Sequence, residues 1–171
     1  AGAKVFLVES LGAFGGMGTS AGIPFICRPT DGIHFLAAGI GEEVYDRVFR
    51  NGGAGPEMVR GKHPAEIDGF IYDPESLKRV YDTMMSESGA DFTFNTALID
   101  VQVENGRINH AVCAAKSGIF AVAASIFIDA TGDGDLAAMA GAPFEFGDAE
   151  GLAQAATLCS LWSGIDWSRK E

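Results

Sequence analysis

Basic residues are scarce in this sequence. Its 171 residues include 12 Lys or Arg against 23 Asp or Glu, which gives a formal net charge of −11. Nucleic-acid binding requires a basic surface that neutralises phosphates, so this charge argues against a nucleic-acid partner. The same charge disfavours docking on an anionic membrane, and a small-molecule substrate is the expected partner.

Cysteines and long apolar runs are also sparse. Cys27, Cys113 and Cys159 are far apart and form no Cys-x-x-Cys pair, a pattern that makes neither a disulfide framework nor a zinc site. The longest apolar stretches have the length of a strand, so no membrane-spanning helix is expected. No signal-peptide pattern opens the chain. These features predict a cytoplasmic protein with reduced cysteines.

Glycine, in contrast, is abundant. It accounts for 23 of 171 residues, or about 13%, against a typical usage of roughly 7%. Residues 11–23 alone contain five glycines. Each glycine in a helix interior costs about 1 kcal/mol relative to alanine. This stretch is therefore predicted to be a loop, or a helix start built for close contact with a ligand.

Two helices are predicted from local signals. Ile40, Val44 and Val48 recur at four-residue spacing, which predicts a helix over residues 40–50 that ends at the glycines after Asn51. A second helix is predicted from Asp73, a capping residue followed by proline, to Gly89. Residues 53–72 between these helices are expected to be irregular.

Strands dominate the remaining pattern. Residues 4–9 form a short apolar run that predicts a buried parallel strand. Asn105-Gly106 is a strong hairpin signal between apolar runs. It predicts a three-stranded antiparallel meander, which a short strand precedes and a short helix follows. The predicted ranges are 91–94 for the short strand, 97–104, 107–115 and 119–128 for the meander, and 136–140 for the helix. The tail after residue 148 is expected to be loosely helical.

Two stretches near the amino-terminal end have residue types suited to a nucleotide. Glu9 ends the first predicted strand, where an acid can hydrogen-bond both ribose hydroxyls of an adenosine. Gly15, Gly16 and Thr19 follow it. Their backbone N–H groups and the threonine hydroxyl are able to reach a phosphate or a ribityl chain. The alternatives are an ordinary surface acid and a flexible loop.

A third stretch covers residues 126–135. The predicted strand runs into Ala-Thr-Gly and then a helix, which would bring small residues and a helix N-terminus to one edge. Such an edge suits a pyrophosphate or a flavin carbonyl. Asp133 is interpreted as the cap of that helix.

The acids of this third stretch also resemble part of a calcium loop. Asp129, Thr131 and Asp133 fit its first ligand positions, but position 12 is Ala140 instead of glutamate. We therefore predict no metal site.

Four stretches in the same order resemble the FAD-dependent oxidoreductases of the glutathione-reductase-like superfamily. The resemblance runs from residue 1 to about residue 165. Its motifs are Ala1–Glu9, Phe14–Thr19, Tyr72–Lys78 and Asp129–Asp135.

The resemblance implies an α/β fold: a Rossmann-like FAD-binding domain with a parallel sheet and a three-stranded antiparallel β-meander. Residues 1–148 would form a partial FAD-binding domain, and residues 149–171 would begin a following segment of the parent protein. Members of the family open with a further strand and a Gly-x-Gly-x-x-Gly loop, which this sequence lacks. The chain is therefore expected to be a fragment truncated at both ends.

The resemblance also implies cofactor roles. Glu9 and Ser10 would bind the adenosine ribose, and the backbone near Ala97 would meet the adenine edge. Gly15, Gly16 and Thr19 of the glycine-rich residues 11–23, called the glycine loop below, would line the phosphate and ribityl region. Residues 130–132 would contact the pyrophosphate side, and Gly134 and Asp135 would contact the flavin end. The full set of expected FAD contacts is Glu9, Ser10, Gly15, Gly16, Thr19, Ala97, Ala130, Thr131, Gly132, Gly134 and Asp135.

By this resemblance the parent protein is an FAD-dependent oxidoreductase that transfers a hydride or electron pair to or from a small organic substrate. Flavin supplies the redox chemistry, so no catalytic acid or base is assigned. Tyr72 and Arg28 are candidates for substrate contact. The isolated fragment is expected to be inactive and to bind FAD weakly or not at all. The alternatives are a non-catalytic structural module that keeps the fold without the cofactor, and a thiazole-synthase-like or NAD-binding enzyme.

Overall fold

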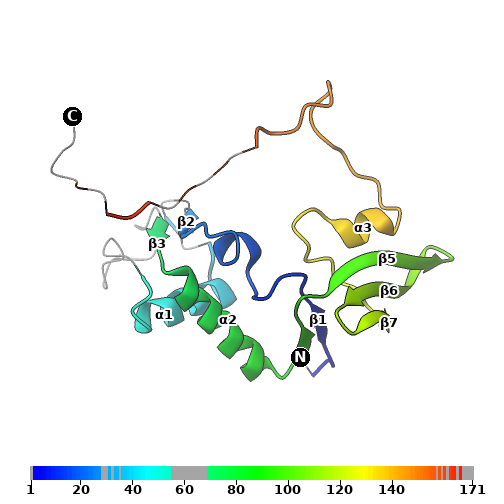
Figure 1. The fold of residues 1–171 in the computed structure, drawn as a ribbon, viewed down its shortest axis with the longest axis horizontal. Helices are drawn as coiled ribbons and strands as arrows, with labels where there is room; N and C mark the ends of the chain where they lie inside the picture. The colour runs from blue at the N-terminus through cyan, green and yellow to red at the C-terminus, as the bar shows by residue number, and fades with distance from the viewer. Residues whose placement is uncertain are drawn as a thin grey trace.

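The structure is a computed structural model that describes residues 2–27, 31, 33–34, 36–54, 69–156, 158, 160, 162–164 and 166. Figure 1 shows α1 and α2 on one side of β1, and the β5–β7 sheet with α3 on the other. In chain order the elements are β1 (Phe6–Val8), η1 (Gly16–Gly18), β2 (Phe25–Cys27), α1 (Ile40–Arg50), β3 (Gly69–Ile71), α2 (Pro74–Ser88), β4 (Asp91–Thr93), β5 (Ala97–Glu104), β6 (Arg107–Ala115), β7 (Gly118–Ala123) and α3 (Asp135–Met139).

The strands form three sheets. β1 and β4 pair in parallel, with Phe6 opposite Asp91 and Val8 opposite Thr93. β2 and β3 pair antiparallel, and β5, β6 and β7 form an antiparallel meander. The predicted mixed α/β class, with a parallel sheet and a three-stranded antiparallel meander, is confirmed.

The first strand differs in one respect from the expectation. It is parallel, as predicted, and its partner is β4, but the predicted range is not fully buried: Val5 and Phe6 are 48% and 44% exposed. Within the described residues β1 pairs with β4 along one edge only, so its other edge and part of its faces stay open.

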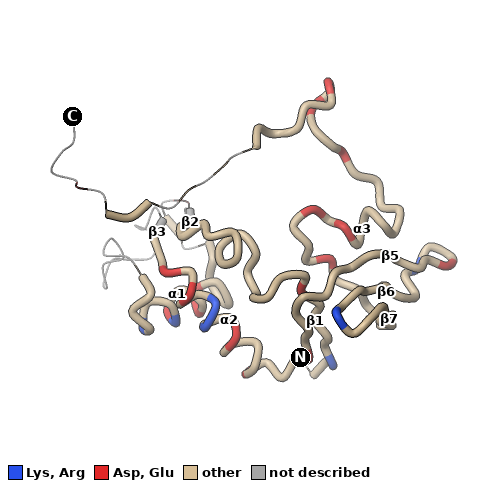
Figure 2. Tube along the Cα trace, in the orientation of Figure 1, with Lys and Arg blue, Asp and Glu red and all other residues tan. Residues whose placement is uncertain are grey.

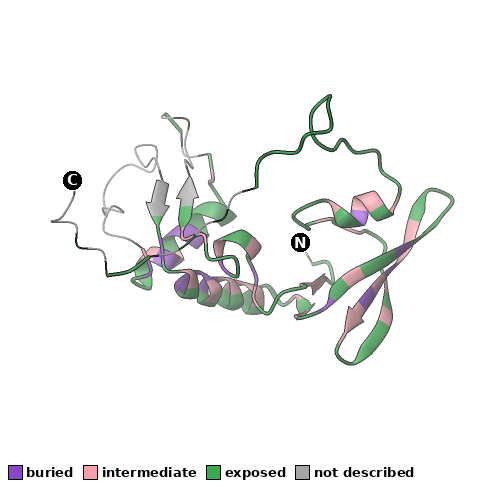
Figure 3. Cartoon of the chain, turned by 45° about the horizontal axis from the view of Figure 1, so that its top comes forward, coloured by how far each residue is buried: buried purple, intermediate pink, exposed green. Residues whose placement is uncertain are grey.

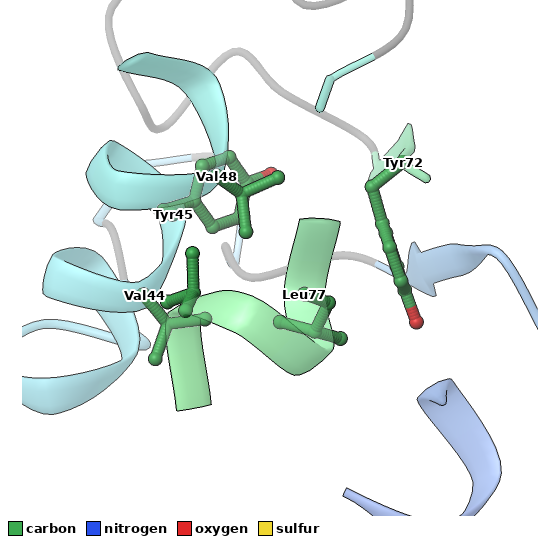
Figure 4. Packing of buried hydrophobic residues seen from close by; sticks show 6 residues of the cluster. Val44, Tyr45, Val48, Tyr72 and Leu77 are labelled. Carbon is green, nitrogen blue, oxygen red and sulfur yellow. The ribbon is translucent and has the colours of Figure 1, made fainter. Parts of the chain in front are cut away.

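The main hydrophobic core lies between α1 and α2. Val44, Tyr45 and Val48 of α1 pack against Leu77 of α2, with Tyr72 beside them (Figure 4). The predicted helix over residues 40–50 is confirmed. Its first residue, Ile40, lies on the exposed side, so the buried face is narrower than the four-residue spacing indicated.

An ion-pair network joins the same two helices on their outer side. The Arg47 guanidinium bonds to Glu43 within α1 and to Glu87 of α2, with 2.6 Å between Arg47 Nη2 and Glu87 Oε2. The Arg47 hydrogen bond lowers the pKa of the Glu87 carboxyl. Because both glutamates are solvent-exposed and Arg47 is only half-buried, these ion pairs orient the helices more than they stabilise them.

The second helix has the ends that the sequence predicts. Asp73 accepts hydrogen bonds from the N–H groups of Glu75 and Ser76 at 3.2 and 2.9 Å. Pro74 occupies the first helical position, and Gly89 closes the helix with φ +70°. The expected N-cap and C-terminal glycine are both confirmed.

The meander is confirmed for its first two strands and shorter than expected in its third. Asn105 and Gly106 have φ values of +51° and +72°, as a two-residue hairpin turn with left-handed residues requires. The third strand ends at Ala123, so the prediction of a strand to residue 128 was wrong. No described strand pairs with residues 124–130, and Ile126 and Ile128 are 79% and 83% exposed. α3 covers this sheet through Leu136, which packs against Val101.

Two short strands were not predicted. β2 and β3 are three residues each, and β3 lies within the range expected to be irregular, of which residues 55–68 lie outside the described part. The loosely helical tail is wrong for the part of residues 149–171 that the structure describes, because no helix is found there. Figure 3 shows this stretch as exposed chain. No helix among the described residues is long and apolar enough to cross a membrane.

Candidate functional site

Glu9 lies directly after β1 and is fixed to the segment that follows β4. Its N–H donates to Thr93 O at 2.9 Å, and its own carbonyl accepts from Thr96 N–H at 3.1 Å. Its side chain is half-buried, and Oε1 accepts from Leu11 N–H at 2.8 Å and from the Ser10 hydroxyl at 3.4 Å. The second oxygen, Oε2, accepts no hydrogen bond from the described residues. One oxygen therefore shapes the local turn, and the other is available to an external hydroxyl group.

Ala97 is brought close to the backbone of Glu9. It opens β5 immediately after Thr96, a fully buried residue whose N–H bonds to Glu9 O. Asn95 N–H also donates to Leu11 O at 3.0 Å. The structure thus assembles Glu9, Ser10 and Ala97 in one place, although they come from segments about 90 positions apart in the sequence.

The glycine loop presents a run of free backbone donors. The N–H groups of residues 12–17 have no acceptor among the described residues. The loop is closed by other bonds, from Gly18 N–H to Gly15 O at 3.2 Å and from Ala21 N–H to Gly16 O at 3.0 Å. Successive N–H groups in a turn conformation make an anion-binding concavity. This loop is therefore chemically suited to a phosphate group.

The two adjacent glycines of the loop serve different purposes. A Cβ on Gly15 would lie 2.7 Å from Tyr81 Cε2 and 2.9 Å from Thr19 Cγ2, so packing excludes any side chain there. A Cβ on Gly16 would have no heavy atom within 4 Å. Gly16 consequently marks the open side of the loop, where a ligand has room.

Thr19 supports the loop from within. Its side chain is 3% exposed, and its hydroxyl donates to Phe14 O at 2.6 Å. The hydroxyl proton is therefore engaged inside the turn. That Thr19 contacts the cofactor remains a prediction, to which the structure adds this internal role.

Phe14 is a member of the site that sequence reasoning missed. Its ring is 7% exposed and packs against Phe92 of β4 and Phe94 just beyond it, with ring centroids 5.1 and 4.6 Å away. No spacing pattern could link residues so far apart in the sequence. The apolar Phe14 within a glycine-rich loop was the one available signal.

The Ala-Thr-Gly segment is organised by Asp129. Its Oδ1 accepts from Thr131 N–H at 3.0 Å and from the Thr131 hydroxyl at 2.7 Å, and its Oδ2 accepts from Ala137 N–H at 2.8 Å. The Thr131 oxygen in turn accepts from Asp135 N–H at 2.8 Å. These bonds, chiefly the one from Ala137, hold the pKa of the Asp129 carboxyl below its usual value.

The interpretation of Asp133 as the helix cap was wrong. The N-cap of α3 is Gly134, with φ +72°, and the capping acceptors are the side chains of Asp129 and Thr131. Asp129 precedes Thr131 by two residues, a spacing typical of side-chain turns, so this signal was present in the sequence. Figure 2 shows acidic residues in the turn before α3.

The predicted contacts fall into two groups in the structure. Glu9, Ser10, Ala97 and the glycine loop form one continuous region. The segment with Ala130, Thr131, Gly132, Gly134 and Asp135 lies over the meander, and no hydrogen bond or ion pair among the described residues joins it to the glycine loop. A ligand long enough to reach both groups would have to be extended.

Tyr72, one of the two candidates for substrate contact, has a structural role. The Tyr72 hydroxyl donates between the carbonyl oxygens of Ile23 and Gly18, which lie 2.8 and 3.1 Å away. Burial raises its pKa, so Tyr72 is part of the core. Arg28, the other candidate for substrate contact, lies outside the described residues. Within the described part, no group of three or more His, Cys, Asp or Glu is arranged to hold a metal ion.

A parallel strand that ends in the Glu9 carboxylate, followed by a loop whose N–H groups have no acceptor among the described residues, defines a Rossmann-like nucleotide-cofactor domain. The sequence model of the family described as FAD dependent oxidoreductase matches residues 1–170. The chain belongs to this family, and its cofactor is FAD.

Two solved structures share the fold. THI4 from Thermovibrio ammonificans is 18% identical with a TM-score of 0.50, over 81% of this chain and 52% of that one. A geranylgeranyl bacteriochlorophyll reductase-like protein from Thermoplasma acidophilum is 19% identical with a TM-score of 0.54, over 81% of this chain and 36% of that one. The chain thus spans about half or less of the length of these structures. No curated protein sequence matches it significantly.

The residues present fit FAD. The free oxygen of Glu9 suits a ribose hydroxyl, and the N–H run of residues 12–17 suits a pyrophosphate. The open space at Gly16 leaves room for the backbone to approach the cofactor closely.

Proposed function

We propose that the protein containing this chain is an oxidoreductase that transfers a hydride or electron pair between FAD and a small organic substrate. Family membership supports FAD as the cofactor, and one structural observation supports the position at which FAD binds. That observation is the run of N–H groups in residues 12–17, which have no acceptor among the described residues and shortly follow the half-buried Glu9 in the chain. Bound flavin supplies the redox chemistry, while the protein binds and orients it.

In this proposal each part of the site has one task. Glu9 Oε2 accepts hydrogen bonds from the adenosine ribose, with Ser10 beside it, and the backbone at Ala97 borders the adenine. The N–H groups of residues 12–17 bind the pyrophosphate, which Gly16 allows to approach. Residues 130–132 border the pyrophosphate side of the extended cofactor, and Gly134 and Asp135 border its flavin end.

The class of substrate is proposed from the net charge of the chain. A net charge of −11 disfavours nucleic acid as a partner, which supports a small molecule. We further propose a cytoplasmic location, an FAD-binding unit within residues 1–148, and a following segment that begins at residue 149.

The experiment compares the full-length protein with two variants that each remove one negative charge. Glu9→Gln removes the negative charge and replaces one carboxylate oxygen with an NH2 group, whereas Glu104→Gln changes an exposed acid at the end of β5. Because a hydrogen bond to a charged group contributes about 1.5–3 kcal/mol, Glu9→Gln should weaken FAD binding roughly ten- to hundredfold. Glu104→Gln should leave the Kd for FAD within about twofold, since exposed charges contribute little.

The wild-type protein should be yellow and release FAD on denaturation, and its flavin should be reduced by the right substrate and reoxidised by an acceptor. A folded full-length protein without flavin would contradict the proposal and would favour the non-catalytic structural module. Equal Kd values for FAD in Glu9→Gln and Glu104→Gln would show that the Glu9 carboxylate does not bind FAD.

A further inference from the structure

Three phenylalanine rings join the glycine loop to the parallel strand pair. Phe14 lies in the loop, whereas Phe92 lies in β4 and Phe94 follows it. The three centroid distances are 5.1 Å for Phe14–Phe92, 4.6 Å for Phe14–Phe94 and 5.3 Å for Phe92–Phe94. Edge-on and tilted rings at such distances attract each other beyond their apolar burial. The cluster is therefore a specific contact.

Backbone bonds hold the start of this segment but stop before the loop. Residues 9–11 are bonded to residues 93–96 through Glu9 N–H, Thr96 N–H and Asn95 N–H. Beyond Leu11, the N–H groups of residues 12–17 have no acceptor among the described residues. Gly12 still lies against the Asn95 side chain, and further along the run the Phe14 ring packs against Phe92 of β4 and against Phe94.

The opposite edge of the loop is held by α2 and by Tyr72, which lies between β3 and α2. Gly15 packs under Tyr81, and the Tyr72 hydroxyl binds Gly18 O. The Phe14 carbonyl accepts from the buried Thr19 hydroxyl. Phe14 accordingly connects the part of the loop fixed by α2 with the strand pair that carries Glu9.

We propose that Phe14 is a positioning residue that fixes the distance between the Glu9 carboxylate and the N–H run of residues 12–17. This inference rests on the proposed function, in which these two groups bind the adenosine and the pyrophosphate of one FAD molecule. Phe14 itself does not contact the cofactor. Its ring keeps the Glu9 carboxylate and the N–H groups of residues 12–17 at the separation that a single extended ligand requires.

The proposal predicts a loss that depends on which parts of the ligand are present. Adenosine uses the Glu9 side alone, whereas ADP and FAD use both sides at once. When the ring contact is removed, the loop must be ordered on binding, and ordering one residue weakens affinity about five- to thirtyfold. ADP and FAD should lose this factor, and adenosine should not.

The test uses the full-length protein with Phe14→Leu, which keeps apolar volume and loses the ring contacts. The matched control is Phe6→Leu, on the partly exposed strand β1 of the same sheet. We expect Phe14→Leu to raise the Kd for FAD and ADP at least about fivefold, while adenosine changes less than about twofold. Phe14→Tyr, which keeps the ring, should restore most of the affinity, and Phe6→Leu should leave all three ligands unaffected.

Three outcomes separate the possibilities. A similar loss for adenosine, ADP and FAD would mean that Phe14 acts only through general stability, and it would overturn the inference. Unchanged affinity of Phe14→Leu for FAD would overturn it as well. Absence of FAD binding by the wild-type protein would instead contradict the proposed function. If Phe14→Leu fails to fold, Phe94→Leu, which removes the closest ring partner, serves for the same comparison.

Discussion

Substitution of the two adjacent loop glycines by alanine should have clearly different effects on stability. Gly15 has φ +101° and would place a Cβ 2.7 Å from Tyr81 Cε2 and 2.9 Å from Thr19 Cγ2. Gly16 has φ +50° and would place its Cβ in open space. Comparison of Gly15→Ala with Gly16→Ala therefore separates the cost of backbone strain from the cost of steric overlap within one loop.

The magnitudes follow from these two contributions. A non-glycine residue at positive φ costs about 1–2 kcal/mol, and this cost applies to both variants. Overpacking adds roughly 1–3 kcal/mol, and it applies only to Gly15→Ala. We expect Gly15→Ala to lower the free energy of unfolding by about 2–5 kcal/mol and Gly16→Ala by about 1–2 kcal/mol.

The assay is urea denaturation of the full-length protein without added FAD, followed by FAD titration of each folded variant. Gly16→Ala should reduce FAD affinity more than its small stability loss suggests, because its methyl group enters the space left for the cofactor. Equal stability losses for the two variants would refute the packing of Gly15 under Tyr81. A Gly16→Ala variant that binds FAD with wild-type affinity would show that FAD does not occupy the open space beside Gly16.

Two further predictions concern the core and the turn before α3. Leu77→Ala should lower the free energy of unfolding by about 2–5 kcal/mol, since Leu77 is buried between α1 and α2; a loss below about 1 kcal/mol in urea denaturation would contradict this core. Because the pKa of Asp129 is lowered in the folded protein, its contribution to stability is present above the ordinary carboxyl pKa and is lost as pH falls through the lowered value. The Tm of the wild-type protein should therefore decrease more steeply below pH ~4 than the Tm of Asp129→Asn, and parallel curves would contradict the role of Asp129.

The sequence predicted best where the determining chemistry is local. The ends of α2 follow from Asp73-Pro74 and Gly89, and the hairpin follows from Asn105-Gly106. In each case a few neighbouring residues satisfy or constrain the backbone. Glu9 was predicted as a site residue for a similar reason, since the end of a strand is visible in the apolar pattern.

The sequence failed where the determining partner is distant. Residues 124–128 have the apolar pattern of a strand, but a strand also needs a paired neighbour, which the described residues do not provide. The cap of α3 comes from Asp129, eight positions before the N–H group of Ala137 that it binds, so the nearer Asp133 was the wrong choice. The aromatic contact of Phe14 with Phe92 depends on tertiary structure alone.

The most direct test of the proposed FAD site is an FAD titration of the apo form of the full-length protein, in parallel with Glu9→Gln and Glu104→Gln. An FAD site that includes Glu9 should give a flavin absorption band on binding, FAD as the released cofactor, and roughly ten- to hundredfold weaker binding for Glu9→Gln alone. A folded wild-type protein that binds no FAD, or binding that is equal in all three proteins, would contradict it.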